Sequence, residues 1–175
     1  MIVLVPFGAV PGDLLDFLRE ELAYRFGEEV RIAEAEPIPE GAFDPKRNQH
    51  RSSLFLRHLE EERQDEDRQE IERRIGIVDV DLYNPESDRL LGETDPVDRV
   101  AVISLAALRS GTEGPEDPRF RARVLKEAVH EVGQTYGLAH CSHPMCVMFP
   151  SNTPPEIDLQ TADFCLTHQS ELKRS

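Results

Sequence analysis

The most informative part of the chain is the stretch Val129-His130-Glu131-Val132-Gly133-Gln134-Thr135-Tyr136-Gly137-Leu138-Ala139-His140-Cys141. In a helix, His130 and Gln134 are four residues apart and project from the same side. Two metal ligands at that spacing can bind one zinc ion, with Glu131 beside the metal-bound water as general base. Gly137 is suited to leave the helix in the left-handed conformation, which glycine adopts easily. The chain can then return His140 to the same centre.

Strands and helices are expected to alternate around this stretch. Apolar runs and alternation predict strands over residues 1–9, 30–35, 75–83 and 100–105, with a short edge strand at 90–91. Helical spacing predicts helices over 13–26 (capped by Asp13), from Ser52 or Ser53 onward, over about 118–136, and from Glu156 onward. The charge run at 60–68 indicates a solvated helical face or a loop. This order predicts an α+β fold with a twisted mixed sheet and helices.

The length and charge of the chain indicate how many domains it has and which partners its charge disfavours. A chain of 175 residues and 19.9 kDa suits one domain, with an N-terminal subdomain at 1–137 and a small C-terminal lobe at 138–175. The 34 acidic and 20 basic residues give a net charge of -14, which repels phosphate backbones and anionic lipid. We therefore expect neither a nucleic-acid partner nor a membrane partner.

The apolar segments resemble neither a membrane span nor a signal peptide, and this bears on where the protein is located. No apolar run approaches the roughly 20 residues of a membrane span. The first seven residues have no basic leader and no small-residue cleavage site, so they do not resemble a signal peptide. We expect a cytoplasmic monomer.

The three cysteines lie close together, between positions 141 and 165. An odd number cannot pair completely in disulfides within one chain. Clustering of this kind, in a chain without an export signal, indicates a metal site before it indicates a disulfide framework.

These motifs together resemble the archaemetzincin family of the metzincin clan. The clan pattern is H-E-x-x-H-x-x-G-x-x-H followed by a Met-turn. In that family a Cys follows the third His, a second Cys comes after four more residues, then Val-Met, and later C-x-x-C. Here Cys141 follows His140, Cys146-Val147-Met148 comes next, and residues 164–168 occupy the last region. Residues 43–49 and 79–83 are also similar to the family, so the resemblance covers most of the chain.

The resemblance implies a metzincin-like zincin domain that hydrolyses peptide bonds. His130 and His140 would be zinc ligands, and Glu131 would act as base and then as acid. Met148 would form the Met-turn below the metal, although a methionine in an apolar run also suits a simple core. An extended peptide would lie against the segment at 88–93 by strand addition.

The chain departs from the family pattern at position 168, where the last Cys is replaced by His. Cys141, Cys146, Cys165 and His168 then form a Cys₃His set, which suits a closed tetrahedral structural zinc site. His143 is an alternative fourth ligand. The other alternative is three buried thiols beside a surface histidine.

The second departure is Gln134, which stands where the family has its second catalytic His. A glutamine offers only a neutral carbonyl oxygen and is a poorer zinc donor than imidazole. Two outcomes stay open: a catalytic zinc that is weak or absent, with impaired hydrolysis, or a peptidase that tolerates Gln134. Substitution by a neighbour such as His143 is disfavoured by its position beyond Cys141. We expect one structural zinc, with the catalytic zinc in doubt. The alternative function is a non-catalytic peptide-binding or scaffold protein.

Overall fold

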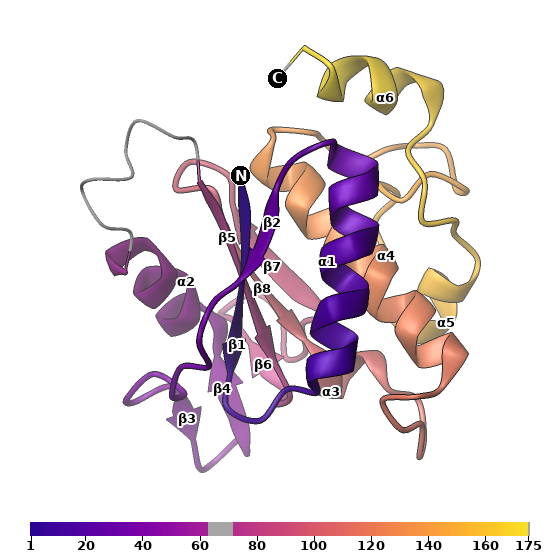
Figure 1. Cartoon of the computed structure of the whole chain (residues 1–175). Helices are drawn as coiled ribbons and strands as arrows, with labels where there is room; N and C mark the ends of the chain where they lie inside the picture. Colours follow the sequence, from indigo (N-terminus) through magenta and orange to yellow (C-terminus); the bar gives the residue numbers. More distant parts are fainter. Residues whose placement is uncertain (63–71, 175) are drawn as a thin grey trace.

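The computed structural model describes residues 1–62 and 72–174, and its main sheet has five strands in the order β2-β1-β5-β8-β7 (Figure 1). These strands are β1 (Ile2–Phe7), β2 (Val30–Ile32), β5 (Arg73–Val78), β7 (Gly92–Asp95) and β8 (Val100–Ser104). All neighbours are parallel except β7, which is antiparallel to β8. The expected mixed sheet is confirmed.

Helices cover both faces of this sheet. Figure 1 shows α1 (Gly12–Phe26) and α4 (Pro118–Thr135) on one face and α2 (Ser52–Glu61) on the other. Ile2 and Leu4 of β1 pack in the core formed with α1 and α4. Val3 and Val5 pack in a second core with Phe55 of α2. Because successive strand side chains point to opposite faces, the continuous apolar run of β1 serves both cores.

A second, smaller sheet replaces the end of one expected strand. It contains β3 (Phe43–Asp44), β4 (Gln49–Arg51) and β6 (Leu82–Tyr83). The single strand expected over 75–83 is wrong, because β5 ends at Val78 and the chain joins this other sheet at Leu82. Between them, the Val80 carbonyl accepts a hydrogen bond from the Ser104 hydroxyl at 2.7 Å. The Asp81 carbonyl accepts from the His50 N–H at 2.8 Å.

The expected edge strand at 90–91 is also wrong by two residues. Leu90 forms only an isolated bridge, in which its N–H donates to the Leu82 carbonyl at 3.0 Å. The edge strand of the main sheet is β7, which begins at Gly92. One edge of β7 pairs with β8, and β7 is the last strand in the order.

Several helix ends differ from the expected ones for local reasons. The strand expected to reach 105 stops at Ser104, whose hydroxyl caps α3 (Leu105–Leu108). α1 begins at Gly12 with Pro11 at the cap position, so Asp13 lies in the first turn instead of capping it. Two helices, α5 (Pro154–Asp158) and α6 (Leu166–Leu172), replace the one expected from Glu156.

The remaining expectations about helices have separate outcomes. The long helix expected over 118–136 is confirmed as α4. The charge run at 60–68 begins at the end of α2, and its part from 63 onward lies outside the described residues. Within the described ranges, no helix combines the length and apolar character that crossing a membrane requires.

Candidate active site and metal centre

The last turn of α4 and the sharp reversal after it gather the candidate ligands. Gly137 has a φ of 82°, in the left-handed region that favours glycine. Its N–H bonds to the Gln134 carbonyl at 2.8 Å, and the Leu138 N–H bonds to the Gly133 carbonyl at 3.2 Å. This pair of bonds closes the helix end and turns the chain back. The ring of His140 consequently lies 5.3 Å, centre to centre, from the ring of His130.

Gln134 connects the two histidines. Its side-chain nitrogen Nε2 lies 3.1 Å from Nε2 of His130 and 2.9 Å from Nε2 of His140. The Nδ1 of His130 lies 2.8 Å from the Val147 carbonyl and donates to it, so Nε2 carries the lone pair. The amide N–H groups of Gln134 therefore donate to both imidazoles. Burial lowers the pKa of both histidines, which favours their neutral, ligand-competent forms.

The side chains of His130, Gln134 and His140 can be compared with the ligands that a catalytic zinc requires. Two imidazole lone pairs converge on one point, as a zinc ligand pair would. The third donor is the Gln134 carbonyl oxygen, which reaches that point only after the amide turns over. The residues therefore fit a zinc ion as two strong donors and one weak neutral donor. In the described part of the chain, the one cluster of three or more His, Cys, Asp or Glu donors lies elsewhere.

Glu131 lies beside these residues in a cleft of about 300 Å³ formed by α4, β7 and residues 149–152. Its side chain is 5% exposed. The Thr94 hydroxyl of β7 donates to Oε2 of Glu131, which fixes the carboxylate. Burial raises the pKa of Glu131 to about 7, and the Thr94 hydrogen bond acts in the opposite direction. A buried carboxyl with a pKa near neutrality has the properties of a general base.

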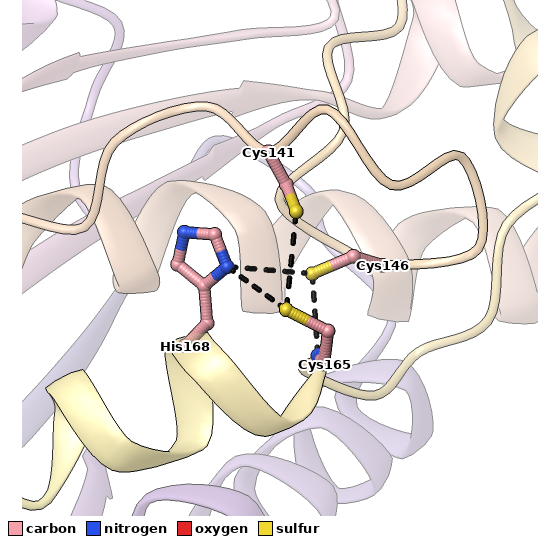
Figure 2. A group of neighbouring side chains, drawn as sticks. All are labelled: Cys141, Cys146, Cys165 and His168. Carbon is pink, nitrogen blue, oxygen red and sulfur yellow. Dashed lines mark hydrogen bonds between the residues drawn. The ribbon is translucent and has the colours of Figure 1, made fainter.

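The three cysteines and His168, all in the part of the chain that follows α4, form a compact group (Figure 2). Their ligand atoms all lie within 4.8 Å of one another. Cys141 Sγ is 3.9 Å from Cys165 Sγ, and His168 Nδ1 is 3.3 Å from Cys165 Sγ. Sulfurs around one tetrahedral zinc ion are separated by about 3.8 Å, given Zn–S bonds of about 2.3 Å. The group therefore fits a structural zinc.

Hydrogen bonds around this group favour its role as a metal site. His168 Nε2 donates to the Ala139 carbonyl at 3.0 Å, which leaves the lone pair on Nδ1 facing the sulfurs. The His143 and Cys165 N–H groups donate to the sulfurs of Cys141 and Cys146. His143 itself is exposed and lies outside the described group, with its Nδ1 accepting from Met145.

Met148 is fully buried and lies against Gly133 of α4. A Cβ on Gly133 would be 2.7 Å from the Met148 sulfur, so the glycine makes room for it. The adjacent Val147 provides the carbonyl that orients His130.

Among the residues that line the cleft, Glu127 and Thr94 were not singled out from the sequence, and Gly92 was considered only as part of the segment at 88–93. Glu127 stands one helical turn before Glu131, and this spacing was the available signal. Gly92 and Thr94 belong to β7, which begins two residues after the start of the edge strand expected at 90–91. The sequence therefore did not predict that they contact α4. All three line the same cleft as Glu131.

Comparison with known proteins gives one consistent result. The model of peptidase family M54 matches residues 26–174. The archaemetzincin of Pyrococcus abyssi is 37% identical over 172 residues, covering 94% of this chain and 90% of that protein. The archaemetzincin of Natronomonas pharaonis is 31% identical and covers 97% of both chains.

Solved structures agree with this result. The zinc-dependent peptidase of Methanocorpusculum labreanum superposes with a TM-score of 0.87 at 26% identity, covering 98% of this chain and 100% of that one. The archaemetzincin of Methanopyrus kandleri gives a TM-score of 0.81 at 29% identity, covering 99% and 94%. The resemblance and the fold expected from the sequence are confirmed, and the chain belongs to peptidase family M54, the archaemetzincin family of zinc metallopeptidases.

Proposed function

We propose that this chain hydrolyses peptide bonds with a zinc ion held by His130, Gln134 and His140, and with Glu131 as general base. The observation that carries the proposal is the convergence of the two imidazole Nε2 atoms on the Gln134 amide, beside a buried carboxyl. A zinc ion bound at this point would supply a polarised water and a Lewis acid for the scissile carbonyl.

The protein groups around that point have separate tasks. Glu131 accepts a proton at its carboxylate and returns it to the leaving amine. The Thr94 hydroxyl keeps Glu131 oriented toward the cleft. An extended substrate would pair with β7, the edge strand along the cleft, by strand addition. We therefore propose Gly92–Asp95, instead of 88–93, as the docking edge.

Gln134 makes this site weaker than one with three histidines. The amide must turn to present its oxygen, and both of its hydrogen bonds to the histidines are lost when it does. Each hydrogen bond contributes about 1 kcal/mol net. The neutral oxygen is also a poorer donor to zinc than imidazole. We therefore expect activity that depends strongly on the free zinc concentration.

The Cys₃His group would hold a separate, structural zinc, and Met148 would form the Met-turn under the cleft. We further propose a cytoplasmic monomer that takes peptides. Its net charge of -14 disfavours nucleic-acid and membrane partners.

Zinc stoichiometry by native mass spectrometry tests the proposed function. We expect one tightly held zinc and a second that appears on titration and leaves under mild chelation. With two zinc ions bound, the chain should cleave members of a peptide library. Glu131→Ala should keep both ions and lose cleavage. A chain that never binds the second ion, or that cleaves nothing when it does, would contradict the proposal.

A further inference from the structure

Glu127 places a second carboxyl in the wall of the cleft, one helical turn before Glu131. The residue is 7% exposed. Among the described residues, no N–H group and no serine, threonine or tyrosine hydroxyl donates a hydrogen bond to this carboxyl, and no basic side chain forms an ion pair with it. A carboxyl removed from water in this way is costly unless a partner reaches it. A cation that enters the cleft would be such a partner.

The strand beside Glu127 leaves room at its carboxyl. A Cβ on Gly92 would lie 2.9 Å from Oε1 of Glu127, which is closer than a Cβ tolerates. Because position 92 is glycine, no side chain of that residue covers the oxygen. Glu127 and Gly92 both line the cleft of about 300 Å³, so a bound side chain can reach the carboxyl from there.

The other charged residues of the cleft make it negative. Glu93 also lines it; Oε1 of Glu93 accepts a hydrogen bond from the Asn84 amide at 2.9 Å, whereas Oε2 is buried and has no hydrogen-bond partner in the described part of the chain. Among the described residues of the lining, Arg89 is the one arginine and there is no lysine. The Arg89 guanidinium donates to the Ala107 carbonyl and lies 3.8 Å from Asp81. Three glutamates against one paired arginine attract cations.

The wall at residues 149–152 suits the hydrocarbon part of a long side chain. Phe149 and Pro150 contribute apolar groups to the lining. The buried Gln160 fixes this wall, because its Nε2 donates to the Phe149 carbonyl at 2.6 Å and to the Ser151 hydroxyl at 2.8 Å. What Gln160 can still offer to a ligand is its amide oxygen, an acceptor. A basic side chain buries its hydrocarbon stem along apolar groups and places its charged end on acceptors.

We propose that the cleft selects peptides that place a basic side chain in it, with the cationic end paired to the carboxylate of Glu127. This inference rests on the proposed function, because it names the substrate class of the same site. It assigns substrate recognition to Glu127 and leaves proton transfer to Glu131.

Two peptides that differ by one charge test the inference without cleavage. Both are acetylated at the N-terminus; one carries a single lysine among alanines, and the other carries norleucine, which has a similar stem and no ammonium group. Calorimetry measures their binding to protein from which the second zinc has been removed by mild chelation, so neither peptide is cut. We expect the lysine peptide to bind about 10- to 100-fold more tightly, the effect of a charged hydrogen bond.

Three results of this measurement would overturn the inference. The first is equal affinity for the two peptides, and the second is no binding of the lysine peptide. The third is a norleucine peptide with a free N-terminus that binds as tightly as the lysine peptide, because the cleft would then recognise a terminal amine.

Glu127→Gln removes the charge and keeps the shape of the side chain. We expect this variant to bind the lysine and norleucine peptides equally. Glu20→Gln removes the same charge at an exposed position of α1 outside the cleft lining, and it should keep the preference for lysine. Thermal unfolding shows that both variants are folded. A lysine preference that survives in Glu127→Gln would overturn the assignment.

Cleavage by the zinc-loaded protein separates this inference from the proposed function. If the chain cleaves a peptide library without preference for lysine or arginine at any position, the inference fails and the proposed function stands. If the chain cleaves nothing, while the lysine peptide binds and Glu127→Gln abolishes its advantage, the proposed function fails and the recognition of a basic side chain stands.

Discussion

The side-chain nitrogen of Gln134 lies 2.9 Å from Nε2 of His140, and it also donates to His130. The amide oxygen is on the opposite side of the same planar group. Gln134 can therefore either tie the two imidazoles together or present a ligand atom to the point between them. Metal binding must compete with this internal hydrogen-bonded arrangement.

Gln134→His should strengthen the second zinc site. Imidazole is a better zinc donor than an amide oxygen, and the competing amide N–H groups would be gone. We expect at least about a tenfold gain in zinc affinity, together with higher peptide hydrolysis at limiting zinc. Zinc titration followed by native mass spectrometry measures the first effect. Tyr24→His, at a residue that is 86% exposed on α1, is the control for adding a histidine. Unchanged affinity would show that the cleft differs from the family in more than this residue.

Gly92→Ala should misplace the general base without touching it. The new Cβ would overlap Oε1 and Cγ of Glu131, at 2.7 and 2.8 Å. Displacement of a reacting group by about 1 Å costs on the order of 100-fold in rate, so we expect a loss of that order in kcat. Gly114→Ala, where a Cβ meets no atom within 4 Å, should behave as wild type. Steady-state peptide cleavage compares the two, and equal rates would count against the close packing of β7 on Glu131.

His168→Ala should empty the Cys₃His group, whereas His168→Cys should keep it filled. Removing one of four ligands leaves an open site, while a thiolate restores a tetrahedral set. We expect the Ala variant to lose one zinc and to melt about 10 °C lower, because metal binding stabilises this loop-rich region. His143→Ala is the matched control and should keep its zinc. If His143→Ala instead loses zinc, the ligand assignment is wrong.

Asp158→Asn tests a part-buried ion pair that links α5 to α4. Asp158 Oδ2 lies 2.7 Å from Nη2 of Arg123, whose side chain is 3% exposed. The hydrogen bond from Arg123 lowers the pKa of Asp158, so the pair stabilises the fold above the ordinary carboxyl pKa of about 3.9. This contribution is lost as pH falls through the lowered value.

The expected loss for Asp158→Asn at pH 7 is about 1.5 kcal/mol in free energy of unfolding, the lower end for a charged hydrogen bond. The difference from wild type should shrink below pH 4. Urea unfolding at several pH values measures it. Asp163→Asn, which removes a charge from a side chain that is 72% exposed, should change stability little. A difference that stays constant down to pH 2 would contradict the ion-pair explanation.

Local patterns were enough to predict the elements that carry this chemistry. The periodic apolar face of α4 and the glycine at 137 determine where the long helix runs and how it ends. The features that the sequence did not predict depend on hydrogen bonds to residues far away in the chain. The strand expected through 83 breaks because Ser104 and His50 take the carbonyls of Val80 and Asp81. Nothing local to 75–83 indicates those bonds.

In the candidate site, too, some features follow from local sequence and others depend on distant contacts. Spacing alone placed His130 and Gln134 on one side of a helix. The contact of Gly92 with Glu131 depends on where β7 meets α4, which requires the register of the whole sheet. The orientation of the Gln134 amide depends on which nitrogen of His130 carries the proton, and the Val147 carbonyl determines that.

Val147 connects the Cys₃His group to the candidate active site. It lies between Cys146 of the Cys₃His group and Met148, and its carbonyl sets the tautomer of His130. The segment that carries two of the Cys₃His ligands, Cys141 and Cys146, therefore also holds His130 in the tautomer that a metal ligand needs. A change that loosens this segment would release the ring of His130 as well as the sulfurs.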